Sequence, residues 1–201
     1  MLNSNLDNHI FIVECLKLLF NLTYDGELFS RKDINGTYIH LNLMKFCLDQ
    51  LRKANSISIT DPEYSIRANA LNLILNIPYD FLMAELSSQK GVELIDSVLS
   101  FLDFNLKIYK QDREVKTVDV IYPLLALMTK HSKNNDIVRR YLRKKILPAG
   151  LDRSMRPEDG NTLKSYLVYL LVGTNLDLKQ AAGDFLFTLC KRNGNISFLF
   201  Q

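Results

Sequence analysis

The side chains that most often carry catalysis are sparse and isolated in this sequence. Its three histidines are His9, His40 and His131, and its three cysteines follow no metal-ligand spacing. The chain contains no GxGxxG, GxxxxGK, HExxH or GxSxG, so the phosphate-loop, zinc-protease and hydrolase signatures fail. The neighbouring carboxylates Glu158 and Asp159 fall in an expected turn. We therefore expect a protein that is not an enzyme and that uses no metal and no cofactor.

A row of asparagines is the polar feature with the clearest pattern. Asn69, Asn72 and Asn76 recur at spacings of three and four residues, which places them on one face of a helix. Asparagine is a mediocre helix former, so three in one row need a reason. Their amides offer donors and acceptors to the backbone of a bound chain. We interpret the row as a wall of a concave binding surface; the alternative is a solvated helix face.

A basic cluster is the second polar feature, and it comprises Arg139, Arg140, Arg143, Lys144 and Lys145. At helical spacing Arg139 and Arg143 share one face, and Arg140 and Lys144 share another. Guanidinium groups suit carboxylates, including the C-terminal carboxylate of a chain. The alternative is a solvated basic face near the C-terminal end of a helix, where cations are favoured.

Both features lie on predicted helices, because apolar residues recur at helical spacing almost throughout. A third helix begins at the N-cap Asp61 with Pro62 in its first turn, and Asp177 is the predicted N-cap of the last helix. No convincing strand competes. Polar loops are predicted at 25–36, 54–60 and 110–116. The predicted helices are 8–23, 38–53, the third up to Pro78, 91–109, 118–131, 137–145, 162–172 and 178–192.

Four helices share one repeated pattern, a small residue followed by large apolar residues at i+3, i+4 and i+7. The copies are 15–22, 70–77 and 182–189, with a weaker copy at 120–127. In the first copy, Glu14, Lys17 and Asn21 take the places of the asparagine row. Repeating helical units of this kind stack into solenoids. The sequence thus predicts an all-α, armadillo/HEAT-like helical-repeat solenoid with a right-handed superhelix, built as a single domain over 1–201.

Composition supports long helices and a protein partner. Only 8 of the 201 residues are glycine and 5 are proline, while 47% are hydrophobic. A net charge of +3 without basic runs between exposed aromatics argues against nucleic acid. The chain shows neither a signal peptide nor a stretch of membrane-spanning length. We expect a cytoplasmic location, no integral membrane segment, and buried thiols in a reducing compartment.

Several segments resemble the synembryn family, the armadillo-type chaperones and nucleotide-exchange factors for heterotrimeric G-protein α subunits. The resemblance covers most of the chain and is weakest over 26–60 and 79–115. Its most specific part is the block Ala-Ala-x-x-Phe-Leu-Phe-x-Leu-Cys with the Arg-Pro-Glu upstream of it. The segments that carry it are Leu18–Thr23, Asn69–Pro78, Val138–Pro148, Arg156–Gly160 and Leu176–Lys191.

The resemblance implies that a groove captures the C-terminal helix of a G-protein α subunit and that binding promotes guanine nucleotide exchange, folding of the α subunit, or both. Such a factor needs no catalytic group, because preferring the nucleotide-free form weakens nucleotide binding by the same factor. Recruitment to the cell cortex or inner membrane face would go through the partner. The predicted partner-binding residues are Lys17, Asn21, Asn69, Asn72, Asn76, Arg139, Arg140 and Arg143.

The resemblance also implies differences between this chain and the family, and two other interpretations of its function stay open. Family members begin before the part matching Met1 and continue past the part matching Gln201, so full exchange activity is not implied by the groove segment. A generic armadillo adaptor without exchange activity is the main alternative. Adaptor grooves for basic import signals are lined by acidic residues and tryptophan, whereas this chain has no tryptophan. An enzyme of unfamiliar type is the second alternative.

Overall fold

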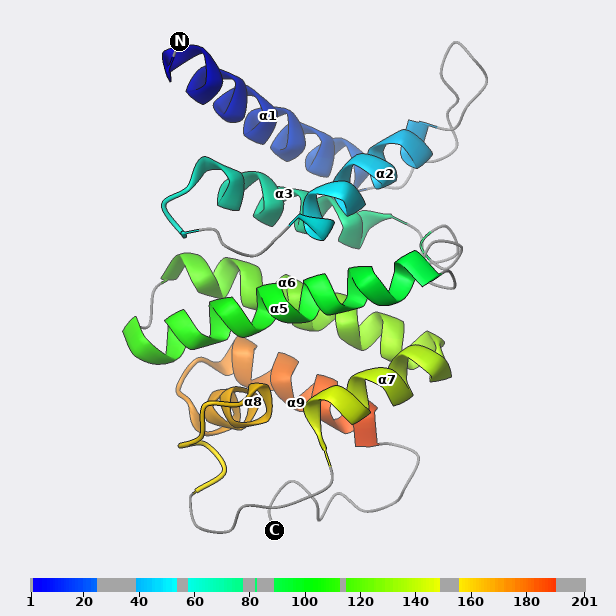
Figure 1. Cartoon of the computed structure of the whole chain (residues 1–201), viewed down its shortest axis with the longest axis vertical. Helices are drawn as coiled ribbons and strands as arrows, with labels where there is room; N and C mark the ends of the chain where they lie inside the picture. Colours follow the sequence, from blue (N-terminus) through cyan, green and yellow to red (C-terminus); the bar gives the residue numbers. More distant parts are fainter. Residues whose placement is uncertain are drawn as a thin grey trace. The chain divides into compact units, whose positions relative to one another are not determined.

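Every regular element in the described part of this computed structural model is an α-helix. The structure describes residues 2–24, 39–53, 58–77, 82, 89–112, 115–148 and 156–190. No strand occurs within these ranges, which confirms the all-α prediction. The helices are α1 (Leu2–Thr23), α2 (Ile39–Arg52), α3 (Pro62–Asn76), α5 (Gln89–Asp112), α6 (Val115–Asn134), α7 (Asp136–Ile146), α8 (Leu163–Val172) and α9 (Leu176–Cys190) (Figure 1).

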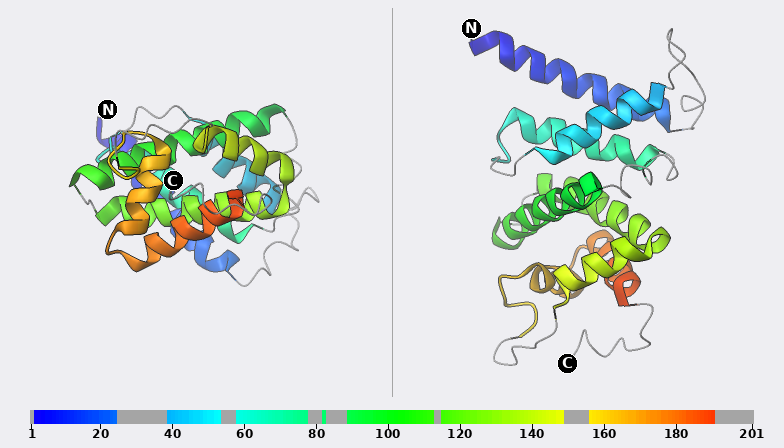
Figure 2. Two further views of the ribbon diagram at one scale, coloured as in Figure 1. Left: turned by 90° about the horizontal axis from the view of Figure 1, so that it is seen from below. Right: turned by 45° about the vertical axis from the view of Figure 1, so that its right-hand side comes forward.

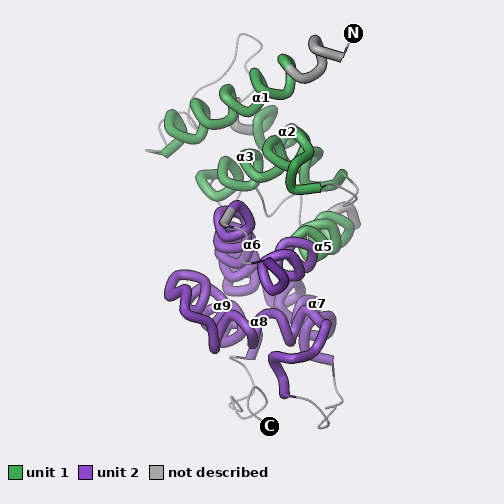
Figure 3. The backbone as a smooth tube through the Cα atoms, turned by 90° about the vertical axis from the view of Figure 1, so that its left-hand side faces the viewer, with its two compact units in different colours: residues 1–101 green, residues 102–201 purple. Residues whose placement is uncertain are grey.

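The chain forms two compact units, and the boundary between them falls inside α5 (Figure 3). The N-terminal unit comprises residues 1–101 and the C-terminal unit residues 102–201. The single-domain organisation and the right-handed superhelix stay predictions.

In the N-terminal unit, α3 packs against both α1 and α2. Its repeat positions Ala70, Leu73, Ile74 and Ile77 are fully buried. The helix begins as the sequence predicts, because the Asp61 carboxylate accepts a hydrogen bond from the backbone N–H of Glu63 at 2.9 Å and Pro62 follows it. The burial of all four positions shows that the repeated pattern marks the core face of this helix.

A buried arginine ties α3 to two other elements of the same unit. Arg67 is 1% exposed, and its Nη2 donates to the carbonyl of Lys53, just beyond the end of α2, at 2.9 Å. Its guanidinium lies 5.1 Å from the ring centroid of Phe101 in α5, and Tyr64 meets the same ring edge-on. Arg67 therefore supplies the end of α2 with a donor while it stacks on an aromatic face.

In the C-terminal unit, α9 packs against α6, α7 and α8 (Figures 1 and 2). Its repeat positions Ala182, Phe185, Leu186 and Leu189 are buried, which repeats the arrangement found in α3. Among the described residues, α6 packs against α9 in this unit and α1 packs against α3 in the N-terminal unit. Each of these two pairs consists of two copies of the repeated pattern.

Two local predictions are wrong. Asn175 caps α9 in place of Asp177, since its side chain accepts from the backbone N–H of Leu178 at 3.0 Å and Asp177 already lies in the first turn. The loop predicted at 110–116 is largely helical, because α5 continues to Asp112 and α6 begins at Val115. The other predicted helices agree with the structure to within a few residues at their described ends, except at the start of α1.

A lysine near the end of α5 explains why that helix is longer than predicted. Lys110 Nζ donates to the carbonyls of Glu158 at 2.8 Å and Gly160 at 3.0 Å. It also lies 5.5 and 5.7 Å from the ring centroids of Tyr166 and Tyr169 in α8. These contacts hold the last turn of α5 against the turn that precedes α8, and local sequence signals do not report them.

Candidate partner-binding surfaces

The asparagine row lies along α3, but its three amides are used differently. Asn69 Nδ2 donates to the Ser65 carbonyl of its own helix at 2.8 Å. Asn76 Nδ2 donates to α1, to the Phe20 carbonyl at 2.9 Å and to Thr23 Oγ1 at 3.1 Å. For Asn72, which is half-buried, no hydrogen-bond partner is found among the described residues. Asn72 is therefore the member of the row whose whole amide lacks a partner within the described part of the chain.

Asn76 has a structural role that the sequence did not reveal. The Phe20 carbonyl lies in the last turn of α1, where backbone carbonyls have no partner within the helix. The Thr23 hydroxyl also donates to the Phe20 carbonyl, at 3.1 Å, so donors from two residues converge on it. Asn76 thus supports the C-terminal end of α1 from the neighbouring helix.

The matching positions on α1 are exposed. Lys17 pairs with Glu14 one turn away, with an Nζ to Oε1 distance of 2.8 Å, and both side chains are more than half exposed. Asn21 is exposed and has no hydrogen-bond partner among the described residues. Because Asn76 joins the ends of α1 and α3, the polar positions of the two helices lie on adjacent elements. Lys17 and Asn21 thus lie on the helix next to the asparagine row, and a shared binding surface stays a prediction.

The arginine cluster lies on α7, in the C-terminal unit, and its members differ in availability. Arg139 is held by Asp136, with Nη2 to Oδ1 at 2.6 Å, and its side chain is only 11% exposed. Arg140 is exposed, and its Nε donates to the Asp136 carbonyl at 3.3 Å. Arg140 therefore presents more of its guanidinium to solvent than Arg139 does.

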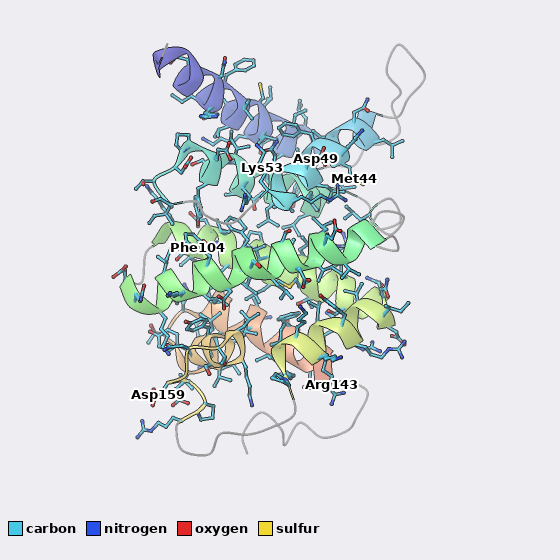
Figure 4. The ribbon with its side chains drawn as sticks, viewed as in Figure 1. Met44, Asp49, Lys53, Phe104, Arg143 and Asp159 are labelled. Carbon is cyan, nitrogen blue, oxygen red and sulfur yellow. The ribbon has the colours of Figure 1, made fainter. Side chains whose placement is uncertain are left out.

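Arg143 lies in the last turn of α7 (Figure 4). Its positive charge affects the thiol of Cys190 in α9. Burial raises the pKa of the Cys190 thiol, and the positive charge of Arg143 partly offsets that rise. The side chain is half-buried. Arg143 is thus close enough to the end of α9 for its charge to affect Cys190. Part of the space around its side chain is therefore filled by α9.

A groove that the sequence analysis missed runs between α6 and α9, with a volume of about 400 Å³. Polar side chains line most of it, and half-exposed Tyr122 contributes an aromatic ring. Alanines at two lining positions leave room between the helices. The lining residues are Tyr122, Ala126, Thr129, Lys130, Lys133, Asn134, Asp177, Gln180, Ala181 and Asp184.

The positions of the groove residues can be found by aligning the copies of the repeated pattern. Aligning the copies in α6 and α9 on the copy in α3 places Tyr122 and Asp184 at the position of Asn72. Ala126 and Ala181 take the neighbouring polar positions, and all four residues line the groove. The face of α3 that carries the asparagine amides therefore corresponds, in the C-terminal unit, to the faces of α6 and α9 that line the groove.

The titratable groups in the described interior suit packing better than catalysis. Burial lowers the pKa of His131 to about 4, and the nearby Lys130 acts in the same direction. Burial raises the pKa of the Cys47 thiol to about 12. Both side chains are thus neutral near pH 7. No three His, Cys, Asp or Glu side chains gather at metal-binding distance within the described residues.

The chain matches a known family over nearly its whole length. The model of the family described as guanine nucleotide exchange factor synembryn matches residues 3–196. The chain belongs to the synembryn family. This confirms the resemblance drawn from Val138–Pro148 and the other segments. None of the helices in the described part of the chain combines the length and the apolar character needed to cross a membrane.

Curated synembryn relatives are similar to this chain at moderate identity. Chaperone Ric-8A of Xenopus tropicalis is 34% identical over 197 residues, and the match covers 90% of this chain and 34% of the relative. The Danio rerio Ric-8A is 31% identical over 194 residues, and mouse chaperone Ric-8B is 25% identical over 211 residues. This synembryn chain spans about a third of the length of the Ric-8A relatives it matches.

Proposed function

We propose that this member of the synembryn family binds the α subunit of a heterotrimeric G protein and promotes guanine nucleotide exchange on it, assists its folding, or both. The family description names a guanine nucleotide exchange factor, and the relatives are named chaperones. The observation that carries the proposal is the row of polar side chains along α3, a helix that buries its repeated apolar pattern and packs against α1. Such a face offers hydrogen bonds to a bound helix without any catalytic group.

The mechanism that fits these residues is linkage between two binding equilibria. A scaffold that binds the nucleotide-free α subunit more tightly than the loaded form must weaken nucleotide binding by the same factor. Each ~1.4 kcal/mol of preference corresponds to tenfold in affinity. No proton transfer or nucleophile is needed, so the proposed activity is non-catalytic.

The proposed contact is the C-terminal helix of the α subunit. Asn72 and Asn21 have no hydrogen-bond partner among the described residues, and Lys17 offers a cation that its surface pair with Glu14 only partly engages. Asn69 keeps its amide oxygen, while Asn76 acts mainly by holding α1 in place. In the C-terminal unit Arg140, with Arg139 and Arg143, supplies positive charge for acidic side chains or the terminal carboxylate.

The proposed partner also defines where the protein acts. Heterotrimeric α subunits work at the inner face of the plasma membrane, so we propose a cytoplasmic protein that reaches the cell cortex through its partner. We propose no nucleic-acid ligand, because the net charge is only +3.

A titration of the 201-residue chain with a labelled peptide, taken from the C-terminal helix of an α subunit, tests the contact. We expect Asn72→Ala and Arg140→Ala to weaken binding clearly, and Arg140→Glu to weaken it further, with helicity unchanged. Lys116→Ala, at an exposed position of α6, is the control. Equal affinity of all variants would remove this site assignment.

Nucleotide release separates the proposal from the generic-adaptor alternative. We expect the chain to accelerate GDP release from the intact α subunit and a saturating excess of GDP to weaken the complex. Peptide binding without any effect on GDP release would favour the adaptor. In the peptide titration, a scrambled peptide of the same composition is the matched control.

A further inference from the structure

A polar cavity of about 440 Å³ lies in the C-terminal unit, between the last turns of α5 and the start of α8. Its described lining shares no residue with the asparagine row, with α7 or with the α6/α9 groove. The volume falls within the range of about 300–1,000 Å³ that is usual for small-molecule sites. The lining residues are Asp103, Lys107, Lys110, Gln111, Asn161 and Tyr166.

Tyr166 is the buried polar residue of this cavity. It is only 4% exposed, yet its hydroxyl has no hydrogen-bond partner among the described residues. Burial raises the pKa of this hydroxyl, and the negative charge of Asp103 acts in the same direction, so the two groups lie near each other. A buried tyrosine normally finds a partner for its O–H. The unpartnered hydroxyl therefore indicates that a ligand completes the cavity.

The charged side chains of the cavity do not balance one another. Asp103 is half-buried and makes no hydrogen bond or ion pair within the described ranges. Burial raises the pKa of its carboxyl, and the positive charge of Lys107 partly offsets that rise. Lys107 is exposed at the mouth of the cavity. With Asp103 ionised, the two ammonium groups of Lys107 and Lys110 against one carboxylate leave the cavity one positive charge in excess.

The ammonium of Lys110 is held in a fixed position. It donates to the carbonyls of Glu158 at 2.8 Å and Gly160 at 3.0 Å, and it lies over the rings of Tyr166 and Tyr169. An ammonium has three N–H donors, so one of them is left for a ligand. No carboxylate pairs with Lys110 in the part of the chain that the structure describes. A cation that is already immobilised loses little side-chain entropy when it binds an anion.

We propose that this cavity binds a small carboxylate. The carboxylate oxygens accept from the ammonium groups of Lys107 and Lys110 and from the Tyr166 hydroxyl. A neutral N–H or O–H group of the same ligand donates to Asp103. The carboxylate belongs either to a free organic acid or to an acidic side chain of a bound protein, because both present the same chemical group.

The charge balance disfavours the other common polar ligands. One negative charge on the ligand neutralises the cavity, whereas a phosphate dianion would place surplus negative charge beside Asp103. A divalent cation is disfavoured because Asp103 is the one acidic side chain in the described lining. The cavity therefore suits a monoanion.

The test is a titration of the 201-residue chain with N-acetylglycine, which carries one carboxylate and one amide N–H. The tyrosine rings are labelled with carbon-13, and the variant Tyr166→Phe identifies the Tyr166 signals by their loss. We expect these signals to shift with a dissociation constant of about 1 mM, which is within the ligand-efficiency bounds for a molecule of this size. The neutral analogue N-acetylglycinamide and inorganic phosphate should each bind at least about tenfold more weakly. Equal binding of either control would overturn the proposal.

Two charge variants should change the affinity in opposite directions. Lys107→Met removes an ammonium and should weaken N-acetylglycine binding about tenfold. Asp103→Asn removes the repelling charge but keeps an acceptor oxygen, and it should tighten binding about threefold. Lys116→Met, at an exposed position of α6 outside the cavity, is the control and should change nothing. A general loss of structure cannot produce opposite changes, so two changes of the same sign, or none, would contradict the proposal.

A capped peptide with a central glutamate, acetyl-Ala-Glu-Ala-amide, distinguishes the two sources of the carboxylate. Binding at least as tight as that of N-acetylglycine assigns the cavity to an acidic side chain of a protein, and weaker binding assigns it to a free organic acid. If neither compound shifts the Tyr166 signals at about 20 mM, well above the expected dissociation constant, the inference is wrong. The proposed function would then stand, because it uses other surfaces of the chain.

Discussion

Asn76 of α3 donates its amide to the backbone carbonyl of Phe20 in the last turn of α1, across 2.9 Å and 56 positions of sequence. A residue that the sequence places in a ligand-binding row thereby holds two repeat helices together. The adjacent row member Asn72 has no such bond within the described residues. Stability and binding can therefore be probed separately, at two residues of the same type on the same helix.

We expect Asn76→Ala to lower the free energy of unfolding by about 1–2 kcal/mol, because the Phe20 carbonyl and the Thr23 hydroxyl each lose a donor in a part-buried site. Urea denaturation followed by circular dichroism measures the change. Asn72→Ala is the matched control and should stay within about 0.5 kcal/mol of the wild type. Equal destabilisation by both substitutions would contradict the role of Asn76.

Lys110→Met keeps most of the aliphatic stem but removes the ammonium that donates to the carbonyls of Glu158 and Gly160. We expect a loss of about 1.5–3 kcal/mol, because the bonds are made by a charged donor to partly buried carbonyls. Backbone N–H groups just before α8 should then exchange hydrogen faster than in the wild type. Lys116→Met, at an exposed position of α6, should change neither quantity.

Arg67→Leu tests the buried arginine of the N-terminal unit. We expect the substitution to destabilise by about 2–4 kcal/mol, since the Lys53 carbonyl loses its charged donor and Phe101 loses the guanidinium on its face. Thermal unfolding gives the measurement. Lys53→Ala is the control, because it removes only a surface ion pair with Glu63 at 3.7 Å and keeps the carbonyl. A variant as stable as this control would show that the buried guanidinium contributes nothing.

His131 makes stability depend on pH in the acid range. Its pKa is about 4 in the folded protein, below the usual 6.5, because the buried ring resists protonation. The unfolded chain binds a proton first as the pH falls, so stability is fully present above about 6.5 and is lost progressively down to about 4, by at most about 3 kcal/mol.

Replacing the ring isolates that contribution. We expect the unfolding free energy of the wild type minus that of His131→Gln to fall as the pH falls from 7 to about 4.5. Urea denaturation at several pH values measures it. A difference that stays constant over this range would show that His131 does not titrate as described.

The helices and their core faces follow from local periodicity. A small residue followed by apolar residues at i+3, i+4 and i+7 predicts the buried faces of α3 and α9, from Ala70 to Ile77 and from Ala182 to Leu189. The same pattern in α1 leaves Leu18 and Leu22 more than half exposed. The pattern identifies an apolar face, but whether a neighbour covers it depends on which helices pack.

The tertiary structure alone decided what the polar residues do. Asn76 finds its partners 53 and 56 positions away, and Lys110 finds its partners 48 and 50 positions away. No local signal contains such pairings, because they arise from the packing of helices that are distant in sequence. The α6/α9 groove has the same origin: its residues stand at register positions visible in the sequence, but only the packing of α6 against α9 leaves open space between them.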